Sequence, residues 1–211
     1  MSPAPFRVFL LSPADCSGKR ARQLQSLDPE HDVGRRIRGR EGAELGEVFS
    51  FVSSLYFRGK LAYARAFARP PRGLPGVHVI TPCDGLRTPE SPLRLGDLRR
   101  YARVPVDVEE ARYRRPLLRD LRALAPEWAE AEVILLGSIA SPKYVDLLTA
   151  ALGVRIFFPS DFVGRGDMSR GGLMLRCAQE GRELLYLPLV GAQRRGARPA
   201  RLPPLARTGA R

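Results

Sequence analysis

Histidine and cysteine are scarce in this chain, and their scarcity excludes several classes of site. The 211 residues include only two histidines and three cysteines. A zinc centre needs about four nitrogen, sulfur or carboxylate ligands close together, so we expect no metal and no other cofactor. His78 lies inside a predicted strand, which argues against a Ser-His-Asp catalytic site. The three cysteines, Cys16, Cys83 and Cys177, make no disulfide framework and indicate a reducing compartment.

Long hydrophobic runs are also missing. The N-terminal run from Val8 to Leu11 is too short for a signal peptide, and no apolar stretch reaches the ~18 residues that a membrane span needs. We therefore expect a soluble, cytoplasmic protein that has no membrane partner. Hydrophobic residues still make up 44% of the chain, which is enough to build a core.

Acidic residues are outnumbered, and the chain carries a net charge of +13. Such an excess is typical of proteins that bind nucleic acid or another polyanion. Only three of the 35 basic residues are lysines (Lys19, Lys60 and Lys143). An arginine-dominated composition with many alanines, glycines and prolines is also what a GC-rich genome produces. Both explanations of the charge stay open at this point.

The C-terminal segment 191–211 differs from the rest because it is basic, rich in proline and alanine, and free of acidic residues. Its arginines are Arg194, Arg195, Arg198, Arg201, Arg207 and Arg211. It has few large apolar side chains, so we expect residues 1–190 to form one α/β domain and residues 191–211 to form a tail. The tail should lie along the surface or be disordered, and it is a candidate docking arm for a protein partner.

Short apolar runs alternate with amphipathic stretches along the chain. The runs predict strands at Phe6–Leu11, Val77–Thr81, Glu132–Gly137 and Val154–Phe158, with a less regular fifth at Glu183–Leu189. The amphipathic stretches predict helices over residues 44–57, 60–68, 109–124, 142–151 and 169–180. This alternation predicts an α/β fold, with a mainly parallel sheet of four to five strands and helices on both faces.

The loops that follow the four clearest strands are rich in small, polar and turn-forming residues. They cover residues 12–20, 82–85, 138–144 and 159–167. Turns and helix caps explain each loop by itself, but they explain less well why all four loops share this composition. Ligands bind at the carboxyl ends of the strands in open parallel sheets. We therefore expect the functional site at this edge of the sheet.

Two aspartates in these loops, Asp15 and Asp84, are the candidate catalytic residues. Either could activate a water molecule or bind a base edge, and either could equally cap a turn. The candidate ligand-binding residues are hydroxyl, thiol, aromatic and basic side chains of the same loops and the helix that follows: Ser12, Cys16, Ser17, Lys19, Ser138, Lys143, Phe158, Ser160, Arg165 and Arg170.

Aromatic and basic residues also alternate in a predicted helix, as they do on nucleic-acid-binding surfaces. Tyr56 and Phe57 are followed by Arg58 and Lys60. Helical spacing places some of these aromatic residues in the core. We assign Tyr56 to the core, and Arg58 and Lys60 to the surface as possible contacts to nucleic acid.

The second half of the chain resembles the uracil-DNA glycosylase superfamily in the order of its parts. The segment from Val133 to Ala140 (Val-Ile-Leu-Leu-Gly-Ser-Ile-Ala) is similar to a late strand of that superfamily, which ends in Leu-Gly and a small residue. Phe158-Pro159-Ser160 falls where those enzymes carry a His-Pro-Ser loop, and Arg165 and Gly166 follow. Ser12-Pro13-Ala14-Asp15 is similar in position to their water-activating loop.

This resemblance implies base and phosphate binding at the strand ends, and a hydrolase of the N-glycosidic or nucleotide type if the protein is an enzyme. The departure at position 158 matters, because a phenyl ring can neither donate a hydrogen bond to a leaving base nor carry charge. A base could still stack on Phe158 or Phe162. The resemblance therefore implies binding more strongly than it implies glycosylase catalysis.

Other pieces resemble the YaaA-like proteins, which are uncharacterised or peroxide-stress DNA-binding proteins. These pieces are Cys16-Ser17-Gly18-Lys19, Leu55-Tyr56-Phe57, and a strand that runs into Asp84-Gly85-Leu86. They are short and scattered along the chain.

The sequence thus predicts a nucleic-acid-associated α/β protein that binds nucleic acid or a nucleotide at the strand ends. Two alternatives stay open. One is a small-molecule enzyme that acts on a nucleotide or a phosphorylated metabolite. The other is a non-catalytic interaction module of a larger assembly.

Overall fold

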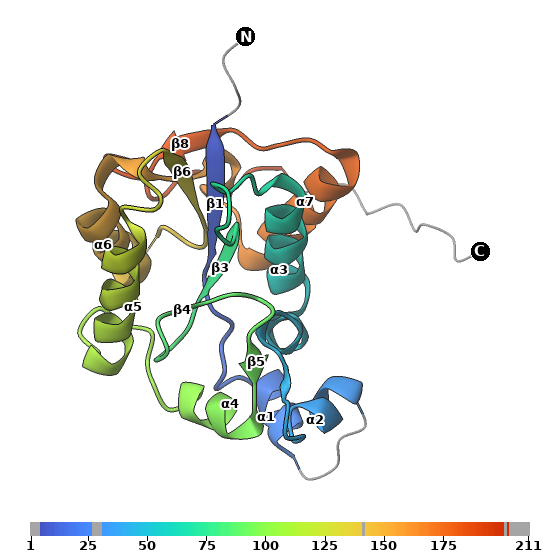
Figure 1. The fold of residues 1–211 in the computed structure, drawn as a ribbon. Coiled ribbons are helices and arrows are strands. Elements are labelled where there is room, and N and C mark those ends of the chain that lie inside the picture. The colour runs from blue at the N-terminus through green and yellow to red at the C-terminus, as the bar shows by residue number, and fades with distance from the viewer. Residues whose placement is uncertain (1–4, 27–30, 141, 201, 203–211) are drawn as a thin grey trace.

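A mainly parallel sheet forms the centre of the computed structural model, which describes residues 5–26, 31–140, 142–200 and 202. The described strands of this sheet lie in the order β4-β3-β1-β6-β7-β8 (Figure 1). They are β1 (Phe6–Leu11), β3 (Val77–Ile80), β4 (Leu86–Arg87), β6 (Ala131–Leu136), β7 (Ile156–Pro159) and β8 (Tyr186–Pro188). β1, β3, β6 and β7 pair in parallel, whereas β4 and β8 are antiparallel strands at the two edges.

The alternation of side chains along β1 supplies a core on each face of the sheet. Phe9 and Leu11 belong to one cluster of buried residues, whereas Val8 and Leu10 belong to another. All four side chains are fully buried. Such a strand must be covered on both sides, because successive side chains point to opposite faces.

Helices cover both faces (Figure 1). The cluster that contains Phe9 includes residues from α3 (Leu45–Phe67), α7 (Asp167–Glu180), α1 (Lys19–Gln25) and α4 (Leu95–Tyr101). The cluster on the other face includes residues from α5 (Ala111–Leu124) and α6 (Pro142–Leu152). Short 3₁₀ turns at Gly153–Arg155 and Ser160–Phe162 lie on either side of β7.

Several small elements lie at the end of the sheet where the parallel strands finish. α1, α2 (Asp32–Arg36) and α4 gather there, together with a two-stranded antiparallel ribbon (Figure 1). The ribbon pairs β2 (Ala43–Glu44) with β5 (Pro92–Leu93). These elements extend the molecule beyond the strand ends, so loops that would otherwise be exposed acquire walls.

A kink divides α3 into two segments. Ser54 has φ 48° and ψ −126°, a conformation that non-glycine residues rarely adopt. The helix resumes at once and runs to Phe67. The kink therefore gives the second segment its own N-terminal turn, beside the carboxyl end of the sheet.

A close crossing between α3 and α7 depends on two glycines. A Cβ atom on Gly59 would lie 2.4 Å from the Gly171 carbonyl oxygen, and one on Gly171 would lie 2.6 Å from the Leu55 carbonyl oxygen. The two helix backbones are in contact here, so neither position has room for a side chain.

The strands predicted from the sequence are present, and so is the predicted arrangement of a mainly parallel sheet. The described sheet has six strands where four to five were expected, because β4 is only two residues long and carries no hydrophobic pattern. The fifth predicted strand is the antiparallel edge strand β8. The helices predicted at 44–57 and 60–68 form the single kinked helix α3.

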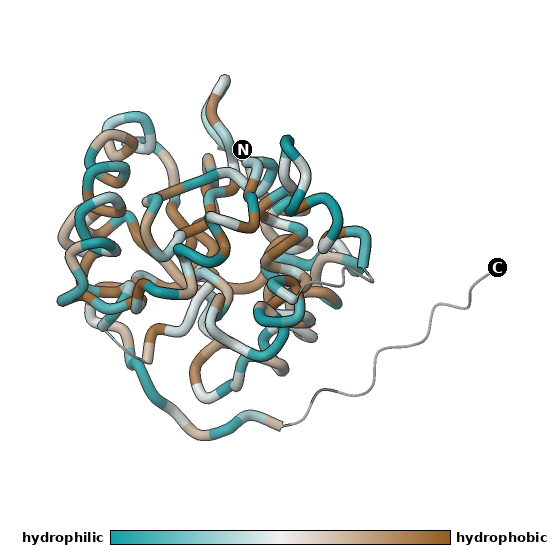
Figure 2. Tube along the Cα trace, turned by 90° about the horizontal axis from the view of Figure 1, so that it is seen from below, coloured by the Kyte–Doolittle hydropathy of each residue, from teal (hydrophilic) through white to brown (hydrophobic). Residues whose placement is uncertain are grey.

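The described part of the C-terminal segment lies against the domain. Arg194 forms an ion pair with Asp146 of α6 at 3.5 Å, and the Ala197 carbonyl lies against Gly164. Figure 2 shows this segment running along the outside of the molecule toward the C-terminus. Residues 201 and 203–211, which include Arg201, Arg207 and Arg211, lie outside the described residues.

Within the described ranges, no helix is both long enough and apolar enough to cross a membrane. Along the trace in Figure 2, hydrophobic segments concentrate inside the molecule and hydrophilic ones outside.

The helix crossing yields a prediction with a matched control on the next residue. Gly171→Ala places a methyl group against the α3 backbone and should destabilise the fold by about 1–3 kcal/mol. Gly172→Ala meets no atom within 4 Å and should stabilise it by up to ~1 kcal/mol, because alanine favours a helix. Urea unfolding of both variants measures the difference. Equal stabilities of the two variants would contradict the close crossing.

Candidate functional site

A cavity of about 570 Å³ opens where β1, β3 and β6 end. The loop after β1 forms one wall, and the start of α6, the kink of α3 and the segment after α4 form the others. Its polar and charged lining residues are Ser12, Asp15, Ser17, Ser53, Tyr56, Tyr101, Arg103, Ser138, Lys143, Tyr144 and Asp167. This volume is in the range of pockets that bind small ligands. We call this cavity the strand-end pocket.

A buried lysine lies behind this pocket. The Lys60 side chain has no exposed surface, and its Nζ atom donates to the backbone carbonyl of Ser12 at 2.5 Å and to Ser12 Oγ at 2.9 Å. Ser12 itself lines the pocket. The hydroxyl of Ser12 therefore lies between the ligand space and the lysine amine.

The surroundings of Lys60 are mainly aromatic. Its Nζ atom lies 4.4 Å from the centre of the Tyr56 ring and 4.7 Å from that of Phe57. Burial lowers the pKa of Lys60 to about 7, because a low-dielectric environment disfavours the ammonium form. Asp167 on α7 raises this pKa, and Lys143 on α6 lowers it. Near neutral pH the amine is therefore present in both protonation states.

Two tyrosines complete this part of the pocket. Burial raises the pKa of Tyr56 to about 12 and that of Tyr144 still higher, so both phenols are neutral. The Tyr56 hydroxyl has no hydrogen-bond partner among the described residues, although Ser12 and Arg170 lie close enough to lower its pKa slightly. A buried donor without a partner is costly and rare.

Asp15 lies at the mouth of the pocket and is exposed. Its Oδ1 atom accepts hydrogen bonds from the Ser17 backbone amide at 3.0 Å and from the Ser17 hydroxyl at 2.6 Å. This is the turn-forming role of aspartate. Cys16, in contrast, is buried, and burial raises its pKa to about 12. It is therefore a neutral thiol and a poor nucleophile.

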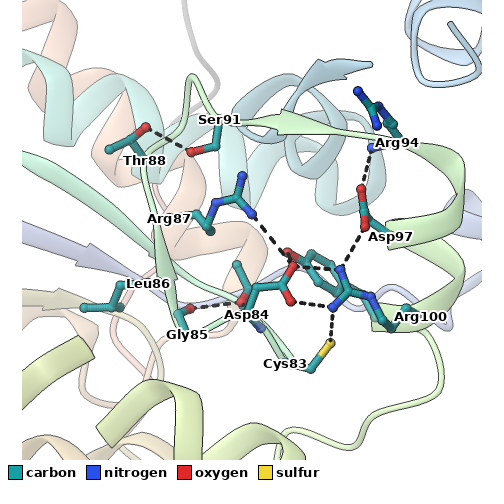
Figure 3. Close-up of polar contacts among 12 residues, drawn as sticks. Cys83, Asp84, Gly85, Leu86, Arg87, Thr88, Ser91, Arg94, Asp97 and Arg100 are labelled. Atoms are coloured by element: carbon teal, nitrogen blue, oxygen red, sulfur yellow. Dashed lines mark hydrogen bonds and ion pairs between the residues drawn. The ribbon is translucent and has the colours of Figure 1, made fainter. Parts of the chain in front are cut away.

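Asp84 lies outside the strand-end pocket, in a network of polar contacts (Figure 3). Arg100 donates to its two carboxylate oxygens at 2.5 and 2.9 Å, and the Tyr101 hydroxyl donates to Oδ2 at 2.8 Å. Arg87 lies 3.8 Å away, and Arg100 also binds Asp97. These contacts fix α4 to the loop after β3. The Asp84 carboxylate is thereby neutralised by partners of this chain.

A second cavity adjoins the first, and four of its lining residues are arginines. It is lined by Cys83, Gly96, Arg99, Arg100, Arg103, Val104, Arg112 and Pro116. Arg103 and Val104 line both cavities. Arg112 is paired with Glu110, and Arg100 with Asp84 and Asp97, whereas Arg99 and Arg103 have no ion pair with any described residue. We call this cavity the arginine groove.

The structure brings about half of the sequence-predicted site residues together. The residues that line the strand-end pocket are Ser12, Asp15, Cys16, Ser17, Ser138 and Lys143. The residues that do not line it are Lys19, Asp84, Phe158, Ser160, Arg165 and Arg170.

The predicted site residues that do not line the pocket have other surroundings. Phe158 is 1% exposed and packs in the core cluster on the α5 and α6 side of the sheet, so its ring offers no face to a base. Arg170 is buried and donates to the Phe162 carbonyl. Arg165 contacts Ser169, and the Ser160 amide donates to Leu185. Lys19 is exposed on the first turn of α1.

Sequence reasoning placed Lys60 at the surface, and this placement is wrong. Lys60 lies on the apolar stripe of α3, four residues after Tyr56 and three before Tyr63, and both tyrosines are buried. This spacing was the available signal, because a polar residue on a buried stripe requires a partner. Sequence reasoning also did not single out Tyr144 and Asp167 as site residues. Any helix start tolerates a residue of either kind, so neither position carried a signal.

The described residues contain no group of three or more histidine, cysteine, aspartate or glutamate side chains that could hold a metal ion. Comparison of the chain with protein-family models, with curated proteins and with solved structures finds no match. The function must therefore be argued from the geometry of the site.

The buried lysine predicts an unusual dependence of stability on pH. Between about pH 7 and the ordinary lysine pKa of 10.5, Lys60 is protonated in the unfolded chain but neutral in the folded protein. The unfolded state then binds more protons, so the free energy of unfolding rises with pH across this range. Each unit of pKa shift corresponds to about 1.4 kcal/mol. Lys60→Met should remove this rise.

Urea unfolding of wild type and Lys60→Met at pH 6.5 and 9.5 measures the effect. The exposed Lys19→Met is the matched control and should keep the wild-type dependence. If the stabilities of wild type and Lys60→Met change in parallel with pH, Lys60 does not titrate as described.

Proposed function

We propose that this protein binds nucleic acid, with one nucleotide in the strand-end pocket and the adjoining phosphates along the arginine groove. The observation that carries the proposal is the shared wall at Arg103 and Val104, which joins a polar pocket to a groove lined by four arginines. Phosphates supply most of the affinity in such complexes, and base contacts supply the selectivity.

The two cavities differ in a way that suits the two parts of a nucleotide. The strand-end pocket offers hydroxyl groups and the carboxylates of Asp15 and Asp167, which can accept hydrogen bonds from base edges and sugars. Asp15 Oδ2 carries no hydrogen bond from a described residue. The arginine groove offers guanidinium groups, which match phosphate geometry. The net charge of +13 favours a polyanion as the partner.

The arginines that lack ion pairs provide the test. Arg99→Ala with Arg103→Ala should weaken the binding of a fluorescently labelled single-stranded oligonucleotide and lower the salt slope by about 1–2, because each phosphate contact contributes about one unit. Fluorescence anisotropy across a salt series measures both quantities.

The control pair is Arg72→Ala with Arg122→Ala, which removes the same charge. Arg72 precedes β3 and Arg122 lies near the end of α5, so both are exposed at the opposite end of the sheet. If both pairs weaken binding equally, the interaction reflects net charge alone, and the arginine groove is not the binding site.

A second candidate is a small-molecule enzyme that acts on a nucleotide or a phosphorylated metabolite. The strand-end pocket favours it, because Lys143 and Arg103 both line this cavity and could hold a single phosphate there.

Ligand length separates the two candidates. If phosphates lie along the groove, an oligonucleotide of about twelve residues should bind at least about tenfold more tightly than a mononucleotide at low salt. Competition of both ligands against the labelled oligonucleotide measures the ratio. Equal affinities would favour the small-molecule enzyme.

A further inference from the structure

The Ser12 hydroxyl and the Lys60 amine form a pair whose geometry goes beyond ligand binding. Their heavy atoms are 2.9 Å apart, which is the hydrogen-bond distance of a nucleophile and its base. Ser12 lines the strand-end pocket, whereas Lys60 is fully buried behind it. A ligand in the pocket therefore meets the hydroxyl first, with the amine directly behind it.

The backbone carbonyl of Ser12 orients the amine toward the Ser12 hydroxyl. A neutral amine has two N–H groups and one lone pair. The Ser12 carbonyl accepts one N–H group at 2.5 Å, so the lone pair is left to accept the proton of the Ser12 hydroxyl. Among the described residues, the amine has hydrogen bonds only to Ser12, although an ammonium group has three N–H donors to satisfy. Burial favours the neutral form by lowering the pKa of Lys60 to about 7.

The space around Ser12 is kept open. A Cβ atom on Gly137 would lie 3.0 Å from Ser12 Cβ and 3.2 Å from Ser12 Oγ, so any larger residue there would crowd the hydroxyl.

We propose that Ser12 is a nucleophile, that Lys60 is its general base, and that the strand-end pocket hydrolyses a carboxylic ester through an acyl-Ser12 intermediate. An uncharged ester is favoured over a phosphate ester, because the carboxylates of Asp15 and Asp167 offset the cations of Lys143 and Arg103 in the lining of the same cavity. This activity does not rest on nucleic-acid binding.

The steps balance without a cofactor. Ser12 Oγ attacks the carbonyl carbon while its proton passes to Lys60 Nζ, which gives a tetrahedral oxyanion. The bond to the leaving alcohol then breaks, and the alcohol takes the proton from the Lys60 ammonium group. Water attacks the acyl-Ser12 ester with Lys60 again as base, which releases the carboxylic acid and restores the Ser12 hydroxyl. The net reaction converts an ester and water into an acid and an alcohol.

A fluorophosphonate probe tests the nucleophile on the full chain. Peptide mass spectrometry should locate the adduct on Ser12, and the labelling rate should rise through a single transition near pH 7 as Lys60 loses its proton. Lys60→Met and Lys60→Arg should each slow labelling at pH 8 by at least about 100-fold, because general-base catalysis contributes about 10²–10⁴-fold. Lys60→Arg leaves a permanent cation, whereas Lys60→Met leaves none.

Ser26→Ala is the matched control, because Ser26 is exposed on the surface and its hydroxyl bonds only the Gln23 carbonyl among the described residues. It should label Ser12 at the wild-type rate, and thermal unfolding checks that each variant is folded. Ser12 without an adduct at every pH between 6 and 9 in folded wild-type protein would overturn the proposal. A rate unchanged by both Lys60 substitutions would overturn the role of Lys60 as the general base.

Discussion

The hydrogen bonds between Lys60 and Ser12 connect the core of this protein to its candidate site. A lysine without exposed surface needs partners, and the end of β1 supplies them through one carbonyl and one hydroxyl. The second segment of α3 must then lie close to the end of β1. The close crossing at Gly59 and Gly171 brings α7, and with it Asp167, to the same place. One buried amine thus fixes the position of two helices relative to the floor of the pocket.

Acidic and basic side chains are distributed unevenly between the two cavities. Asp84 binds Arg100 and Tyr101 and so holds α4 against the loop after β3 (Figure 3). The Asp84 carboxylate therefore has a structural role. By fixing α4, it also sets the position of Arg103, which lies in the segment after this helix. Asp15 and Asp167 share the pocket with Lys143 and Arg103, whereas the charged residues that line the neighbouring groove are all arginines. The arrangement can hold an uncharged or donor-rich group beside an anionic one.

The resemblance to uracil-DNA glycosylases led to the expectation that Phe158 could stack on a base, and the packing of this side chain does not support it. Phe158 follows the order of parts in those enzymes, yet its ring is buried on the α5 and α6 side, away from the strand-end pocket. The reason is the alternation of side chains in β7, since a residue in a strand points to one face of the sheet and not along its edge. The residues of the loop after β1 do line the pocket, because they follow the end of the strand and are not bound by its alternation.

The sequence by itself determined the fold class, the order of the main strands and helices, and the edge of the sheet where polar loops gather. These features follow from local pattern, because hydrophobic periodicity and turn residues act over a few neighbouring positions. Only the tertiary structure decided which polar residues meet. Lys60 and Ser12 are 48 residues apart, and Asp84 and Arg100 are 16 apart. Whether a lysine on a helix is a surface charge or a buried base depends on the element that packs against it, and local pattern does not specify that element.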